Sequence, residues 1–97
     1  MELNEVLERL RAKEGWLRSR GVGGLSVFGS VARGEAGPES DVDLAIRQVR
    51  PLGLSGTGIL RRDLAELLGT EVDLVVEPVV MKPRLQRMID RDRAVAF

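Results

Sequence analysis

The stretch FGSVARGEAGPESDVDLA, residues 28–45, contains the features that decide the fold. It begins with a Gly-Ser pair, Gly29 and Ser30, and it ends with two aspartates, Asp41 and Asp43, in an apolar run. Ten residues separate Ser30 from Asp41, and several of them are turn formers. The pattern indicates a strand that ends at Gly29, a turn, and a second strand that carries both aspartates.

Strands are predicted on both sides of this loop. Residues 25–28 are a short apolar run, which is typical of a buried strand. Residues 41–47 alternate between apolar and polar positions, so they predict a strand with one buried face. Asp41 and Asp43 are two residues apart and should project from the same face, roughly 6–7 Å apart along it. Ser30 is expected to cap a short helix that follows the first strand.

The rest of the chain alternates between helical and strand patterns. The expected elements are helices over residues 2–19, 58–68 and 83–91, a strand over 71–77, and a closing edge strand over 94–97. Alternation of this kind predicts a layered α/β domain. The length of 97 residues favours a single domain over residues 1–97.

Composition excludes several classes of protein. The 15 basic and 15 acidic residues give a formal net charge of zero, which disfavours nonspecific binding to nucleic acid. The absence of cysteine and histidine excludes disulfides, thiolate metal sites and histidine-based catalysis. No apolar run reaches the roughly 18 residues that a membrane span needs, and the N-terminus lacks a signal-peptide pattern. We therefore expect a cytoplasmic protein with no membrane partner.

A third carboxylate, Asp73, lies on the polar face of the strand predicted over residues 71–77. If that strand neighbours the strand of Asp41 and Asp43, the three side chains converge. Three carboxylates without histidine or cysteine suit Mg²⁺ or Mn²⁺ rather than zinc. The Gly29-Ser30 turn before a helix is a natural cradle for phosphate. Together these features indicate phosphoryl or nucleotidyl transfer with two metal ions, roughly 3.5–4 Å apart.

Each feature also has a purely structural interpretation. A Gly-Ser pair after a strand is most often only a turn and a helix cap. Asp73 and Arg33, each taken alone, are more often solvated surface residues. An Asp-x-Asp pair in a strand is more informative, because aspartate is depleted in strands. The combination at this spacing favours the functional interpretation.

The motifs resemble those of the minimal nucleotidyltransferase (MNT) family, within the DNA polymerase β-like nucleotidyltransferase superfamily. The matching segments are Gly29-Ser30-x-Ala32-Arg33-Gly34, Ser40-Asp41-x-Asp43-Leu44 and Val72-Asp73-Leu74-Val75. The resemblance covers nearly the whole chain. It implies an α/β (α+β) fold with a small mixed sheet of the nucleotidyltransferase palm type, with helices packed on one face and an open active site on the other.

The same resemblance implies roles for the three aspartates. Asp41 and Asp43 would hold two Mg²⁺ ions, with Mn²⁺ as an alternative. Asp73 would hold the catalytic ion and help to deprotonate the acceptor hydroxyl. The acceptor oxygen would attack the α-phosphorus of a nucleoside triphosphate, with ATP as the expected substrate, and pyrophosphate would leave.

The resemblance further implies a nucleotide site and a partner. Gly29 and Ser30 would bind the β- and γ-phosphates, and Arg33 would support the triphosphate charge or the loop. Minimal members of the family are commonly paired with a helical HEPN protein, in pairs that resemble toxin–antitoxin systems in which AMP is added to a HEPN tyrosine. A 97-residue chain has no obvious second domain to bind the acceptor. The acceptor surface would then come from a partner protein or a second copy of the chain.

Two other functions stay open. The chain could be an interaction protein that neutralises a HEPN partner by forming a complex, with or without bound nucleotide. It could instead transfer AMP to a small hydroxylated molecule, although the missing second domain argues against this.

Overall fold

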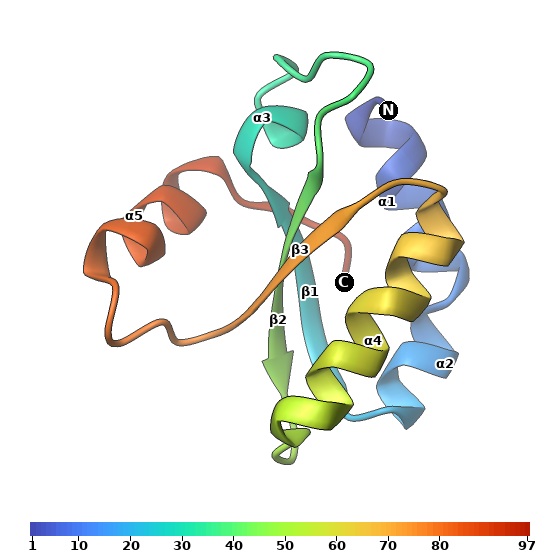
Figure 1. Cartoon of the computed structure of the whole chain (residues 1–97), viewed down its shortest axis with the longest axis vertical. Helices are drawn as coiled ribbons and strands as arrows, with labels where there is room; N and C mark the ends of the chain where they lie inside the picture. Colours follow the sequence, from blue (N-terminus) through green and yellow to red (C-terminus); the bar gives the residue numbers. More distant parts are fainter.

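The computed structural model describes residues 1–97, the whole chain. Its helices are α1 (Leu3–Ala12), α2 (Glu14–Ser19), α3 (Gly29–Ala32), α4 (Gly53–Leu68) and α5 (Pro83–Asp92), and its strands are β1 (Val22–Phe28), β2 (Val42–Gln48), β3 (Val72–Val76) and β4 (Ala94–Val95). Figure 1 shows α1, α2 and α4 on one side of the sheet, α5 on the other, and α3 at one end. No helix has the length and apolar character that crossing a membrane would require.

The four strands form one mixed sheet in the order β3-β2-β1-β4. β1 pairs antiparallel with β2 and with β4, whereas β2 and β3 are parallel. A parallel pair needs a long crossover, and α4 supplies it between β2 and β3. The predicted α/β fold with a small mixed sheet is therefore confirmed.

One face of the sheet carries the main apolar core. Val42, Leu44 and Ile46 of β2 are fully buried there, against Leu60 and Leu64 of α4 among other residues. Burial of each such side chain stabilises the fold by roughly 1.5–3 kcal/mol. Because successive side chains of a strand point to opposite faces, this arrangement fixes the intervening residues of β2 on the other face.

The second face is only partly open. Phe28 of β1, Ala45 of β2 and Ile89 of α5 form a small buried cluster on it. The expectation of helices on one face holds for α1, α2 and α4, but α5 covers part of the opposite face. The reason is that Phe28 and Ala45 leave an apolar area there, which the apolar side of α5 buries.

Two helix boundaries differ from the sequence prediction. The predicted helix over residues 2–19 is two helices, with a break at Lys13 just before the weak helix former Gly15. α4 begins at Gly53 rather than at residue 58, although glycines disfavour a helix. Thr57 supports this early start, because its Oγ1 donates a hydrogen bond to the carbonyl of Gly53 at 2.7 Å.

β1 begins at Val22 rather than at residue 25, and it includes two glycines. A Cβ atom at Gly23 would lie only 2.7 Å from Cγ1 of Val49, so glycine permits a close approach to the chain after β2. The pairing with β2 is irregular between Val22 and Gly24. The additional strand residues 22–24 therefore depend on contacts with β2 and the chain after it, and not on their own strand propensity.

The predicted cap at Ser30 was wrong. α3 begins at Gly29, and the residue before it, Phe28, makes no side-chain cap. Ser30 lies inside the first turn of α3 instead. The remaining strands and the last helix are confirmed within two residues of their predicted ends.

Candidate active site

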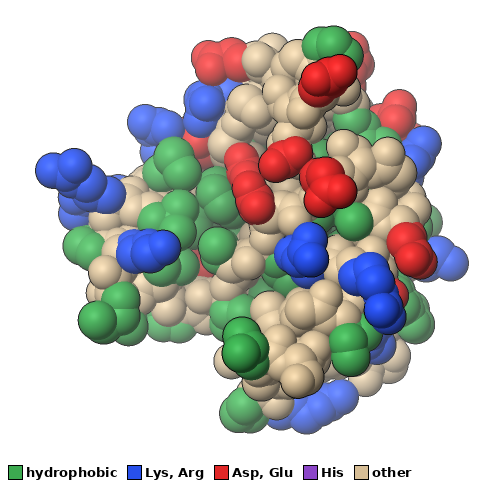
Figure 2. Space-filling view, viewed as in Figure 1, with side chains coloured by type: hydrophobic (Ala, Val, Ile, Leu, Met, Phe, Trp, Pro, Cys, Tyr) green, Lys and Arg blue, Asp and Glu red, His purple; other side chains and the backbone are tan.

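β2 and β3 place two aspartates side by side. Asp43 is in register with Asp73 in the parallel β2–β3 pair, and neighbouring strands lie roughly 4.8 Å apart. Asp41 directly precedes β2 and is exposed. Figure 2 shows acidic side chains gathered over the starts of these strands, below α3 and to the right of α5. The structure thus brings Asp43 and Asp73 together, with Asp41 at the edge of the site.

Asp43 is electrostatically strained. Partial burial, the charge of Asp73 and a hydrogen bond with it, and the charge of Asp41 raise the pKa of Asp43 to about 6, against a smaller opposing effect of Arg33. When like charges disfavour the ionised form of a carboxyl group, a bound cation stabilises that form. The pKa of Asp43 therefore marks this cluster as a candidate functional site.

The turn at Gly29 lies directly against Asp43. Gly29 has a φ of 75°, which side chains other than glycine rarely adopt, and a Cβ atom there would overlap the carboxylate of Asp43. The first N–H groups of a helix have no partner within the helix. With only four residues α3 has a small dipole, so these N–H groups and the hydroxyl of Ser30 are the groups of this turn that could bind a phosphate.

Gly29→Ala is expected to lower nucleotidyl transfer by roughly a hundredfold, because the new methyl group would displace the Asp43 carboxylate. The control is Gly69→Ala at the end of α4, where φ is 73° and no atom lies within 4 Å of the added Cβ. Both changes should destabilise the fold by roughly 1–2 kcal/mol, since both force alanine into the left-handed region. Equal activity of the two variants, measured as pyrophosphate release, would contradict this role of Gly29.

The metal site expected from the sequence is only partly assembled. Carboxylate oxygens are the donors that Mg²⁺ prefers, and the register supplies two of them, Asp43 and Asp73. The side-chain positions do not gather three or more acidic residues into a group that could hold a metal ion. The donor chemistry therefore fits Mg²⁺, whereas the exposed side chain of Asp41 would have to turn toward the pair to join it.

Arg33 connects α3 to α5. Its Nη1 donates to the Asp92 carboxylate at 2.7 Å and its Nε donates to Glu35 at 3.0 Å. The Asp92 side chain is only 2% exposed. Hydrogen bonds from Arg91, which has the largest effect, and from Arg33 keep the pKa of Asp92 below its usual value, although burial acts to raise it. These contacts favour support of the loop over direct contact with a triphosphate as the role of Arg33.

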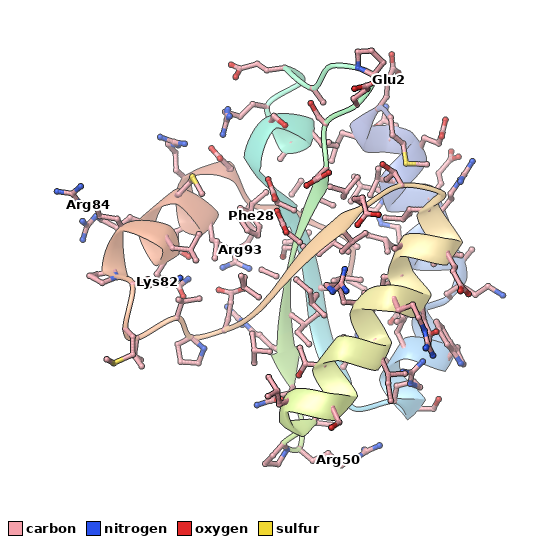
Figure 3. All side chains as sticks on the ribbon, viewed as in Figure 1. Glu2, Phe28, Arg50, Lys82, Arg84 and Arg93 are labelled. Atoms are coloured by element: carbon pink, nitrogen blue, oxygen red, sulfur yellow. The ribbon has the colours of Figure 1, made fainter.

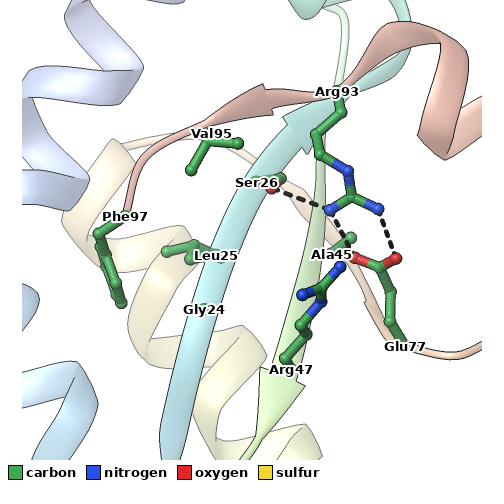
Figure 4. A pocket seen from close by; sticks show the side chains of 9 residues that line it. All are labelled: Gly24, Leu25, Ser26, Ala45, Arg47, Glu77, Arg93, Val95 and Phe97. Atoms are coloured by element: carbon green, nitrogen blue, oxygen red, sulfur yellow. Dashed lines mark hydrogen bonds and ion pairs between the residues drawn. The ribbon is translucent and has the colours of Figure 1, made fainter.

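Sequence reasoning missed a polar network on the same face of the sheet. Arg93 donates to both carboxylate oxygens of Glu77, at 2.8 and 2.6 Å, and to Oγ of Ser26 at 3.1 Å (Figure 4). Gln86 donates to Glu77 at 2.9 Å. The adjoining cavity, with Arg47 on its wall, has a volume of about 110 Å³, well below the roughly 300 Å³ of a small ligand pocket. The network therefore holds α5 and β4 to the sheet, and no local sequence pattern marks it.

This combination of paired aspartates and an overlying Gly-Ser turn agrees with the comparison to known families. The profile of the family described as a nucleotidyltransferase domain matches residues 3–95. The chain belongs to the nucleotidyltransferase domain family. Within it, this small nucleotidyltransferase is of the minimal type and is an enzyme.

Similar proteins are named for a particular kind of nucleotidyl transfer. A protein of Methanocaldococcus jannaschii, provisionally named a protein adenylyltransferase, is 33% identical over 91 residues, which are 93% of each chain. Protein adenylyltransferase MntA of Thermococcus cleftensis is 40% identical over 78 residues, 79% of each chain. The nucleotidyltransferase therefore has relatives named for transfer of an adenylyl group to protein.

Solved structures share the fold. One described provisionally as a minimal nucleotidyltransferase is 35% identical, has a TM-score of 0.79, and covers 97% of this chain and 95% of its own. An MNT antitoxin in complex with the tri-AMPylated HEPN toxin of Shewanella oneidensis is 20% identical, with a TM-score of 0.67 and coverage of 94% and 71%. The predicted resemblance to minimal nucleotidyltransferases is confirmed.

Proposed function

We propose that this nucleotidyltransferase transfers AMP from ATP to a hydroxyl group of a HEPN-type partner protein and so acts as an antitoxin. The observation that carries the proposal is the Asp43–Asp73 pair beneath the Gly29 turn. Relatives named protein adenylyltransferase support the reaction. Solved complexes of the same fold, one with AMP-PNP and one with an AMPylated HEPN toxin, support the nucleotide and the partner.

The turn after β1 would bind the triphosphate. The first N–H groups of α3 and the hydroxyl of Ser30 would donate to the β- and γ-phosphates. Arg33, held by Asp92 of α5, would keep α3 in place while ATP binds. Gly29 lets this turn approach Asp43, so the turn that would bind the triphosphate lies directly beside the carboxylates.

Asp43 and Asp73 are the residues that would hold Mg²⁺, with Asp41 completing the set after its exposed side chain turns inward. Bound Mg²⁺ would offset the charge of the triphosphate and of pyrophosphate. Burial and like-charge repulsion raise the pKa of Asp43, and such a cation would relieve the repulsion.

The transfer step exchanges a phosphoanhydride linkage of ATP for a phosphoester linkage to the acceptor. The acceptor hydroxyl oxygen bonds to the α-phosphorus, and the bond from the α-phosphorus to the oxygen that bridges it to the β-phosphorus breaks. Pyrophosphate leaves with the bonding electron pair. Asp73, which is more exposed than Asp43, would take the proton from the acceptor hydroxyl.

The decisive experiment uses ATP labelled on the α-phosphorus, Mg²⁺, the full chain and a HEPN protein from the same organism. The wild type is expected to label the HEPN protein, with a mass increase of one or more AMP units, and the Asp41→Asn/Asp43→Asn variant is expected to lose the label. Glu66→Gln is the matched control, because Glu66 is an exposed residue of α4 on the other side of the sheet. The control should label the HEPN protein at the wild-type rate.

Other outcomes separate the competing functions. If the double variant neutralises the HEPN protein as well as the wild type does, the chain is an interaction protein and the proposed transfer is wrong. If AMP passes to small hydroxylated acceptors without any partner, the protein acceptor is wrong.

A further inference from the structure

α5 and the loop before it carry a surface unlike the rest of the molecule. Val80 is 76% exposed and Met81 is 88% exposed. Further along the chain, at the start of α5, are the exposed cations Lys82, Arg84 and Arg87. We call these five residues the α5 patch. Figure 2 shows hydrophobic and basic side chains gathered over this lobe, beside the acidic side chains at the starts of β2 and β3. Arg84 extends away from the sheet in Figure 3.

The cations of the patch form no ion pair within the chain. The ion pairs of this region are made by Arg91 and Arg93, which bind Asp92, Glu77 and Asp90. The inward side of α5 is occupied separately, because Ile89 is buried against Phe28 and Ala45. The patch is therefore an outer surface with unpaired positive charge and two large apolar side chains.

The loop that presents Val80 and Met81 is anchored. The backbone N–H of Val79 donates to Oε1 of Gln86 at 2.8 Å, and Gln86 in turn donates to Glu77 at 2.9 Å. Val79 itself packs toward the Ile89 cluster. The start of the loop is thus tied to α5 at Val79, directly before the two exposed apolar side chains. A pre-organised apolar contact of this kind loses little entropy on binding.

The chemistry of the patch favours a protein over a nucleic acid. Arginine and methionine are enriched at protein interfaces, and apolar anchors surrounded by charge are typical of their centres. Binding of single-stranded nucleic acid relies on aromatic stacking and an extended basic groove, and the patch has no aromatic residue. Three unpaired cations call for carboxylates on the partner.

The position of the patch connects it to the proposed reaction. α5 ends at Asp92, which binds Arg33 of α3 beside the aspartate site. A ten-residue helix is roughly 15 Å long, so the patch lies about that far from the site. A protein domain spans such a distance, whereas a small hydroxylated molecule does not.

We propose that the α5 patch is the docking surface for the protein that accepts AMP, which contacts it through carboxylates around an apolar depression. This inference rests on the proposed function, because it assumes a protein acceptor. The patch holds the acceptor protein while a hydroxyl group elsewhere on that protein reaches Asp73.

The test compares Lys82→Glu/Arg84→Glu with Arg61→Glu/Arg62→Glu, an equal charge change on exposed positions of α4. Negative charge is favourable in the first turn of a helix, so the α5 variant should fold. Binding to the HEPN protein is measured with Asp43→Asn present, which removes chemistry. KM values for the HEPN protein and for ATP are measured without it.

The α5 variant is expected to weaken binding at least tenfold and to raise KM for the HEPN protein at least tenfold, with KM for ATP unchanged. Equal effects of the two variants overturn the inference, as does an Asp43→Asn protein with an unchanged α5 patch that does not bind the HEPN protein. Loss of binding to a labelled RNA, with protein binding intact, also overturns it. A wild type that binds through the patch but transfers no AMP supports the docking surface and refutes the proposed function, so the two failures are distinguishable.

Discussion

Asp43→Asn is expected to abolish AMP transfer and at the same time to stabilise the fold. The rate should fall by at least about a thousandfold, because the carboxylate proposed to hold the cation and to face the triphosphate is lost. The fold should gain about 1 kcal/mol at pH 7.5, after allowance for the solvent that screens this partly exposed group. The gain arises because asparagine removes a partly buried charge that also lies beside Asp73.

The stability difference should depend on pH with a definite sign. The pKa of Asp43 is about 6 in the folded chain and near its ordinary value of 3.8 in the unfolded chain. Between these values the folded state binds more protons, so Asp43 lowers the stability as pH rises from about 4 to 6. Glu77 acts in the opposite direction at lower pH, because Arg93 lowers its pKa, and this contribution is common to both proteins.

The measurement is urea unfolding of wild type, Asp43→Asn and the exposed-site control Glu66→Gln, in the presence of EDTA, at pH 4 and pH 7.5. Asp43→Asn should be more stable than the wild type at pH 7.5 and equal to it at pH 4. A variant that is less stable than the wild type at pH 7.5 would show that the Asp43 carboxylate is not strained.

Arg93→Ala is expected to destabilise the fold by roughly 3 kcal/mol, because removal of one partner leaves a buried charge unpaired. The Glu77 side chain is only 5% exposed and that of Arg93 is 20% exposed. Domains of this size have a total stability of roughly 5–15 kcal/mol, so the loss would be a large fraction. Thermal and urea unfolding would measure it.

Two comparisons test the cause of that loss. Arg87→Ala, on the exposed side of the same helix, should change stability by less than about 0.5 kcal/mol. Glu77→Leu/Arg93→Met, which removes both charges and keeps apolar volume, should recover most of the loss. If the double variant is as unstable as Arg93→Ala, the shape of the side chains and not the unpaired charge of Glu77 is responsible.

The candidate site was predictable in part. Alternation in β2 and β3 predicted that Asp43 and Asp73 lie on the polar faces of two strands. That they are neighbours follows only from the parallel pairing of β2 with β3. The assignment of Asp41, Ser30 and Arg33 to the site stays a prediction, and Arg33 is bound to Asp92, 59 residues away in the chain.

The sequence by itself determined the order of elements, the buried face of each strand and the Gly29-Ser30 turn, because these depend on residues a few positions apart. Tertiary structure alone decided the early start of α4 despite its glycines, the extension of β1 to Val22, and the place of α5 on the second face. It also decided the Glu77–Arg93 pair. The physical reason is that burial and pairing between distant segments contribute more free energy than local propensity, which spans only about 1 kcal/mol per residue.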